Sequence, residues 1–149
     1  MSKILNVCLY GPVTDGWSYQ DNLLPKYQKE NGHDVTVVTS KWIWDSRGEL
    51  VKTDRDDYYN EYGIRTIRLD IANDKHLSYK FKKFIGLEKV LYSIEPDVIF
   101  VHCFQFLDIV TIIEYAKKHE NIKLYVDNHC DFSNSATSWV SKNVLHKII

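Results

Sequence analysis

Chemically reactive side chains gather where apolar segments of the chain end. His102 and Cys103 follow one apolar run. His129, Cys130 and Asp131 follow the next. An imidazole can donate a hydrogen bond or hold a proton near neutral pH, and a neighbouring carboxylate can orient it. We expect His129, in a polar loop, to carry the chemistry, with Asp131 and His102 binding substrate. The other interpretations are a loop-packing imidazole for His129 and a satisfied strand-end histidine for His102.

Two histidines and two cysteines at neighbouring strand ends also suggest zinc. The spacing contains neither CxxC nor HxxxH. Alternate side chains of a strand point to opposite faces, so adjacent His and Cys diverge. The sequence therefore predicts no metal site and no bound cofactor.

The loop that follows the first apolar run reads GPVTDGWS. A phosphate-binding loop needs Lys after its second Gly, where this chain has Trp17. The spacing of a dinucleotide-binding fingerprint is also absent. What remains is Gly16 beside a predicted helix start, where free backbone N–H groups could meet an anion or a sugar hydroxyl. We therefore predict that Asp15, Gly16 and Trp17 contact substrate, the alternative being a tight strand-to-helix turn.

Apolar runs and helical periodicity alternate along the chain. This alternation predicts a Rossmann-like, doubly wound, mostly parallel sheet with helices on both faces. We expect the strand order 3-2-1-4-5, with the reversal between the first and fourth strands. A mixed sheet with an antiparallel edge hairpin from 48 to 69 is compatible with the same pattern. Strands are predicted at 4–10, 35–39, 63–69, 98–102 and 123–126, and helices at 18–31, 78–94, 107–119 and from 134 onward.

The carboxyl ends of these strands should share one edge of the sheet. Ligands of open parallel sheets bind at that edge. Residues 11–16, 102–106 and 128–133 are therefore expected around one crevice. The long polar segment 40–60 is expected to be an insertion, with a hairpin that turns at Arg47-Gly48.

Size and charge narrow the classes of function. A chain of 149 residues has the size of one domain. Its net charge of -1 provides no overall positive electrostatic field that would attract nucleic acid. Three cysteines without a framework spacing indicate reduced thiols. We therefore expect a cytoplasmic protein. The predicted 78–94 helix has a lysine-rich side. This side is either a solvated face or a peripheral contact with the inner membrane, and its residues are Lys80, Lys82, Lys83 and Lys89.

Three segments together resemble family 4 retaining glycosyltransferases of the GT-B fold. The first is GPVTDGWSYQDNLLPKYQKENGHDVTVVTS, with a Gly-His-(acid)-Val strand start at Gly32-His33-Asp34-Val35. The second is EPDVIFVHCFQF, which is similar to the fourth strand of the family. The third is LYVDNHCDF, a strand that ends in a His-bearing loop. The first loop departs from the family, since Asp15-Gly16 stands where many members have two adjacent glycines.

The resemblance implies two Rossmann-like domains that face each other across a cleft. Residues 1–149 would be the amino-terminal, acceptor-side domain, cut before the carboxyl-terminal domain that binds the donor. The implied reaction moves a sugar from a nucleotide-sugar co-substrate to a hydroxyl of a polysaccharide or lipid-linked glycan intermediate, with retention and without a metal. In this family the His129 position lies close to the transferred sugar. The chain alone is expected to be inactive.

Two further interpretations stay open. One is a non-catalytic, acceptor- or membrane-binding subunit that partners a separate donor-binding chain. The other is part of a GT-B-fold nucleotide-sugar epimerase.

Overall fold

A six-stranded sheet forms the centre of the computed structural model, which describes residues 1–72 and 82–128. The strand order is β5-β6-β2-β1-β7-β8. All neighbours are parallel except β5 and β6, which are antiparallel. The predicted order and its reversal between the first and fourth predicted strands are confirmed, and β5 adds the antiparallel edge. The strands are β1 (Lys3–Cys8), β2 (Asp34–Ser40), β5 (Asp57–Tyr59), β6 (Arg65–Leu69), β7 (Val98–His102) and β8 (Lys123–Asp127).

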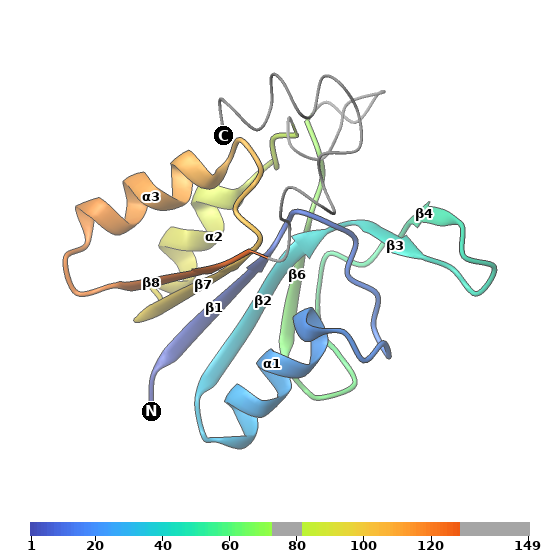
Figure 1. Cartoon of the computed structure of the whole chain (residues 1–149), viewed down its shortest axis with the longest axis horizontal. Coiled ribbons are helices and arrows are strands. Elements are labelled where there is room, and N and C mark those ends of the chain that lie inside the picture. Colours follow the sequence, from blue (N-terminus) through green and yellow to red (C-terminus); the bar gives the residue numbers. More distant parts are fainter. Residues whose placement is uncertain (73–81, 129–149) are drawn as a thin grey trace.

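Apolar side chains on both faces of the sheet explain why the central strands lack a polar alternation. In β1, Leu5 and Val7 belong to the larger buried cluster, whereas Ile4 and Cys8 belong to a second, smaller cluster. Such double-sided burial is typical of parallel sheets covered by helices on both faces. Figure 1 shows α1 (Gln20–Glu30) on one side of the sheet, and α2 (Leu87–Ile94) with α3 (Ile109–Lys118) on the other. The Rossmann-like, doubly wound architecture is confirmed.

The second predicted helix is shorter than expected. Its described part begins at Leu87, after Gly86 with φ +91°. The preceding segment forms a bridge between Ile71 and Phe84, and the Ile85 amide donates to the Asp70 carbonyl at 2.8 Å. The backbone of residues 83–85 therefore pairs with residues 70–72 instead of forming a helix. The predicted helix over 78–94 was wrong for residues 82–86.

The same rearrangement corrects the predicted lysine-rich face. Lys82 is buried, with 5% of its surface exposed, while Lys83 and Lys89 are exposed. Lys80 lies outside the described residues. Since Lys82 precedes the helix and is buried, these lysines do not form the single helical face that the sequence predicted.

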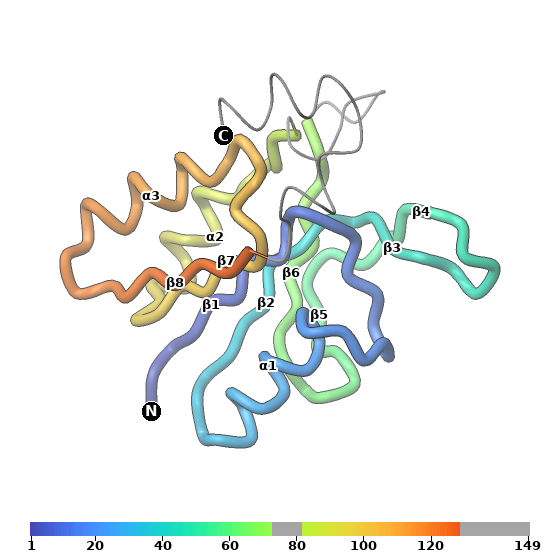
Figure 2. Tube along the Cα trace, viewed as in Figure 1, coloured from blue at the N-terminus to red at the C-terminus, as the bar shows by residue number. Residues whose placement is uncertain are grey.

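The insertion between β2 and β6 contains a separate hairpin. β3 (Trp42–Trp44) and β4 (Leu50–Lys52) pair in antiparallel fashion, and the turn contains Gly48 with φ +75°. The predicted turn at Arg47-Gly48 is confirmed. Figure 2 shows this hairpin projecting away from the main sheet, beyond the loop that follows β1.

Candidate functional site

Predicted site residues lie at the carboxyl edge of the sheet. His102 is the last residue of β7 and pairs in register with Asp127, the last residue of β8. Asp15 and Gly16 lie in the loop that leaves β1. The point between β1 and β7 is where the strand order reverses, which is where ligands of such sheets bind. The described residues there form two clusters, one around His102 and one around Asp15.

His102 is enclosed by polar side chains from three other elements. Only 4% of its surface is exposed. Its Nδ1 lies 3.2 Å from the Asp21 carboxylate and 3.3 Å from that of Asp127. Its Nε2 lies 3.4 Å from Asn6 Oδ1. Because Asn6 Nδ2 donates to Gln28 at 2.6 Å, the Asn6 oxygen faces the histidine. The imidazole is thus fixed at the sheet edge.

Asp127 organises the turn after β7 and was missed as a site residue. Its Oδ1 accepts a hydrogen bond from the Cys103 amide at 3.0 Å, and its Oδ2 accepts one from Gln20 Nε2 at 2.9 Å. Cys103 has φ +59°, a left-handed conformation that costs a non-glycine residue free energy. The Asp127 contact supports that backbone. An acidic residue at the end of an apolar run is visible in the sequence, but Asp127 was interpreted only as the end of a strand.

Asp15 lies at the centre of the second cluster. Its carboxylate accepts hydrogen bonds from the Tyr58 hydroxyl at 2.7 Å and from Arg68 at 3.3 Å, and it pairs with Arg55 at 3.4 Å. The Arg68 side chain is 1% exposed and also donates to the Val13 and Ser40 carbonyls. The loop after β1 is therefore attached to β5 and β6 by a partly buried charged network.

A pocket of about 330 Å³ opens beside this network. Burial and the Asp15 carboxylate, in that order, raise the pKa of Tyr58 to about 12, against the opposing charge of Arg68. Tyr58 therefore donates as a neutral phenol at physiological pH. Tyr58 and Arg68 were not predicted as site residues. The pocket is lined by Thr14, Asp15, Ile43, Thr53, Arg55, Tyr58 and Arg68.

Gly16 and Trp17 occupy the outer part of the same loop. Gly16 has φ +78°, and its amide donates to the Glu61 carboxylate at 2.7 Å. The anion that meets the Gly16 amide is therefore a side chain of the protein itself, the Glu61 carboxylate. The helix begins at Gln20 instead of near residue 18, so Gly16 lies farther from its start than the sequence predicted. The Trp17 ring is half-buried and lies 5.4 Å from the exposed Tyr19 ring.

Two predicted site residues, His129 and Asp131, lie outside the described residues. The described chain reaches Asn128, one residue past the end of β8, so the strand that precedes His129 ends at the carboxyl edge as predicted.

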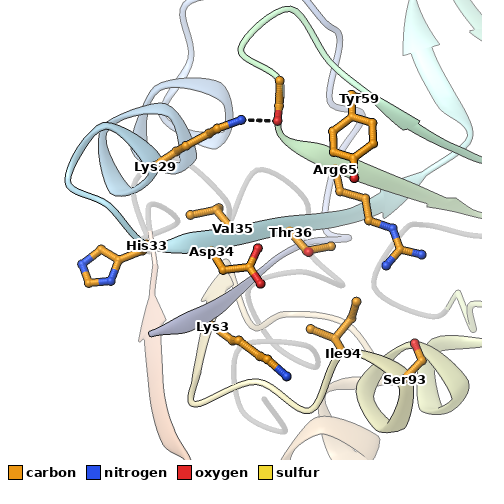
Figure 3. Close-up of a pocket in the computed structure, with 11 residues that line it drawn as sticks. Lys3, Lys29, His33, Asp34, Val35, Thr36, Tyr59, Arg65, Ser93 and Ile94 are labelled. Atoms are coloured by element: carbon orange, nitrogen blue, oxygen red, sulfur yellow. Dashed lines mark hydrogen bonds between the residues drawn. The ribbon is translucent and has the colours of Figure 1, made fainter. Parts of the chain in front are cut away.

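A pocket of about 410 Å³ lies at the opposite, amino edge of the sheet. Figure 3 shows Lys3 and Asp34 from the starts of β1 and β2, Arg65 from the start of β6, and Lys29 donating to the Gly63 carbonyl. Among the described residues that line this pocket, none is a predicted site residue. Because parallel sheets bind ligands at their carboxyl edge, we keep the candidate site at the Asp15 and His102 clusters.

Comparison with solved structures finds a similar fold in sucrose-phosphate synthase from Thermosynechococcus elongatus. The TM-score is 0.62 at 13% sequence identity. The match covers 99% of this chain and 38% of that chain. The chain thus has a glycosyltransferase-like fold. No family model and no curated protein sequence matches the chain.

Among residues 1–72 and 82–128, no helix is both long enough and apolar enough to cross a bilayer.

Proposed function

We propose that this chain is the acceptor-side, amino-terminal domain of a nucleotide-sugar-dependent glycosyltransferase, similar to family 4 retaining enzymes. The observation that carries the proposal is the structural match, which takes in nearly all of this chain but only 38% of sucrose-phosphate synthase. A match of that extent supports one domain of a larger sugar-transferring enzyme. The carboxyl edge, where the predicted residues lie, would then face the cleft between two domains.

The loop after β1 suits the acceptor. Asp15 and Gly16 are held in place by Arg68, Tyr58 and Glu61, so the loop is preorganised. The Trp17 and Tyr19 rings lie outside that framework and offer aromatic surface on which a sugar ring can stack. Asp15 would accept hydrogen bonds from acceptor hydroxyls at the mouth of the 330 Å³ pocket. Acceptor binding is therefore assigned to this side of the edge.

The reacting sugar is assigned to the other side, near His102. His129 would donate a hydrogen bond to a sugar hydroxyl or stabilise charge that develops on the ring, and Asp131 would orient it. The leaving diphosphate would be stabilised by side chains and helix N-termini of a second domain, without a metal at the reacting bond. The isolated chain then lacks most of the stabilisation that favours the transition state over the substrate.

Acceptor binding can be measured on the 149-residue chain itself. Saturation-transfer NMR with a panel of neutral oligosaccharides should show contact with the parent chain. Trp17→Ala should abolish that contact, whereas the control Tyr59→Ala, an exposed aromatic on β5, should retain it. Equal signals from both variants would contradict the acceptor assignment.

A second measurement tests the domain assignment separately. The isolated chain should turn over UDP- and GDP-sugars no faster than a boiled control. Turnover above that control would show that the chain already holds a complete transferase site.

A further inference from the structure

Three side chains that commonly ligate metals converge at the carboxyl end of β1. Cys8 is the last residue of β1, His102 is the last residue of β7, and Asp21 lies in the first turn of α1. One ligand atom from each of the three lies within 4.8 Å of the other two. From the sequence, only the histidines and cysteines that follow the fourth and fifth predicted strands were considered as zinc ligands, and Cys8 and Asp21 were not. β1 and β7 are neighbours in the sheet, and α1 brings Asp21 to their ends.

The hydrogen bonds of His102 leave the correct nitrogen facing the group. Asn6 directs its amide oxygen at Nε2, as described above, so Nε2–H has an acceptor there. Nδ1 lies 3.2 Å from Asp21 and 3.3 Å from Asp127, a position in which a cation between them would take its lone pair. A histidine that binds a metal through one nitrogen typically donates the other N–H to an oxygen of the protein. Asn6 supplies that oxygen here.

Two carboxylates gather beside the buried thiol and imidazole. Cys8 and His102 are 2% and 4% exposed. Asp21 and Asp127 each place a carboxylate oxygen within 3.3 Å of His102 Nδ1. A divalent cation would offset the gathered carboxylates and displace the thiol proton.

We infer that Cys8 Sγ, the Asp21 carboxylate and His102 Nδ1 form a zinc site, with Asp127 beside the fourth position. Sulfur, imidazole and carboxylate ligands together suit zinc better than calcium or magnesium, which take oxygen ligands. Metal–ligand bonds of about 2.1 Å give tetrahedral edges of about 3.4 Å. The distance of 3.2 Å between His102 Nδ1 and the Asp21 carboxylate is close to such an edge.

This site goes beyond the proposed sugar transfer and takes no part in it. The zinc ion would join β1, β7 and α1 at the edge where the strand order reverses. Asp127 would link the ion to the turn at Cys103 through the hydrogen bond to that residue's amide. The ion would therefore fix the geometry of the reacting side of the cleft.

Cys103 provides a matched control. It is also buried and reduced, but its Sγ lies 3.7 Å from Asn128 Oδ1, and it does not belong to the group of three. The 149-residue chain is stripped with a chelator, reloaded with Zn²⁺ and assayed for bound zinc by mass spectrometry. The parent chain and Cys103→Ser should each bind one zinc ion. Cys8→Ser should bind zinc at least ~100-fold more weakly, because it loses a thiolate ligand.

Cobalt reports the ligand directly. The Co²⁺-loaded parent and Cys103→Ser should show a thiolate-to-cobalt absorption band that Cys8→Ser lacks. Asp127→Asn should weaken zinc binding by roughly 10- to 100-fold, as expected of a group that flanks the ligands.

Asp21→Asn keeps the test decisive if Cys8→Ser does not fold, since the Asp21 side chain is 38% exposed and its replacement is nearly isosteric. A folded Asp21→Asn with unchanged zinc affinity would overturn the inference. Failure of the parent chain to bind zinc would overturn it as well. So would equal zinc binding and equal cobalt bands in Cys8→Ser and Cys103→Ser.

Discussion

Two arginines of β6 lie three residues apart and face different environments at the two ends of the sheet. Arg65, at the amino end, has a side chain that is 41% exposed, and it forms two hydrogen bonds of 2.7 and 3.0 Å with Asp57. Arg68, near the carboxyl end, is 1% exposed. It donates to two backbone carbonyls, to the Asp15 carboxylate and to the Tyr58 hydroxyl.

The difference lies in what surrounds each guanidinium. Water screens the exposed pair of Arg65, so its net contribution to folding is small. The buried Arg68 has lost its water and depends on every acceptor that the protein supplies. The pocket at the amino end is lined by the exposed Lys3, Lys29 and Asp34, whereas at the carboxyl end the buried Arg68 and the exposed Arg55 both bond to Asp15. The carboxyl edge is therefore the preorganised end, as a binding site requires.

Replacing Arg68 should have the largest effect on stability. Arg68→Leu removes the donor to Asp15 and to two carbonyls and leaves these acceptors in a partly buried site. We expect the free energy of unfolding to fall by about 3 to 5 kcal/mol. Urea denaturation followed by circular dichroism measures this change. Arg68→Lys, which keeps the charge but not the planar fork, should lie between Leu and the parent. A loss below about 1 kcal/mol in Arg68→Leu would place Arg68 with exposed pairs and remove the contrast.

The sheet could be predicted from the sequence because its strands are apolar on both faces. An apolar run such as that of β1 is stable chiefly as a strand buried on both faces of a sheet. Because helices alternate with these strands along the chain, neighbouring strands are expected to be parallel. The helix predicted over 78–94 is confirmed for Leu87–Ile94, but its start could not be predicted correctly. Its apolar spacing suited a helix, but the segment before Gly86 pairs with the chain near Ile71 instead. Tertiary pairing thus overrode a local pattern.

The candidate site could be predicted only in position. Strand ends identified the edge that contains Asp15, Gly16 and His102. Nothing local showed that Arg68 would be buried, because a charged residue in a strand is expected to face water. Contacts such as Cys8 with Asp21 depend on how α1 lies on β1. The predictions for His129 and Asp131 stay untested.

Removing the Tyr58 hydroxyl should have an intermediate effect. Tyr58→Phe loses the donor to Asp15 and the acceptor for Arg68 Nε, at 2.7 and 2.8 Å. Because Tyr58 is half-buried, we expect a loss of about 1.5 kcal/mol at neutral pH, the low end for hydrogen bonds to charged groups. Urea denaturation of Tyr58→Phe, with the exposed Tyr59→Phe as control, measures this loss.

The pH dependence of the same variant sharpens the test. The folded pKa of Tyr58, about 12, lies above the ordinary value of 10.0. Folding thus favours the neutral phenol, and this contribution is complete below pH 10 and disappears as the pH rises toward 12. Parent and Tyr59→Phe should lose stability in that window more steeply than Tyr58→Phe. Identical slopes would mean that Tyr58 titrates as an exposed tyrosine does.

Arg65 should give the smallest effect and so completes the comparison with Arg68. Arg65→Gln breaks both hydrogen bonds to Asp57, but both partners are exposed, so we expect a loss of about 0.2 to 1 kcal/mol. Arg65 lowers the pKa of Asp57 through these hydrogen bonds. The stabilisation is therefore present above the ordinary carboxyl pKa and is lost as the pH falls through the lowered value. Added salt should also reduce it, because exposed pairs are screened. Urea denaturation of parent and Arg65→Gln at neutral pH, at acid pH and in high salt measures all three effects. A loss in Arg65→Gln as large as that in Arg68→Leu would mean that burial does not distinguish the two ends of the sheet.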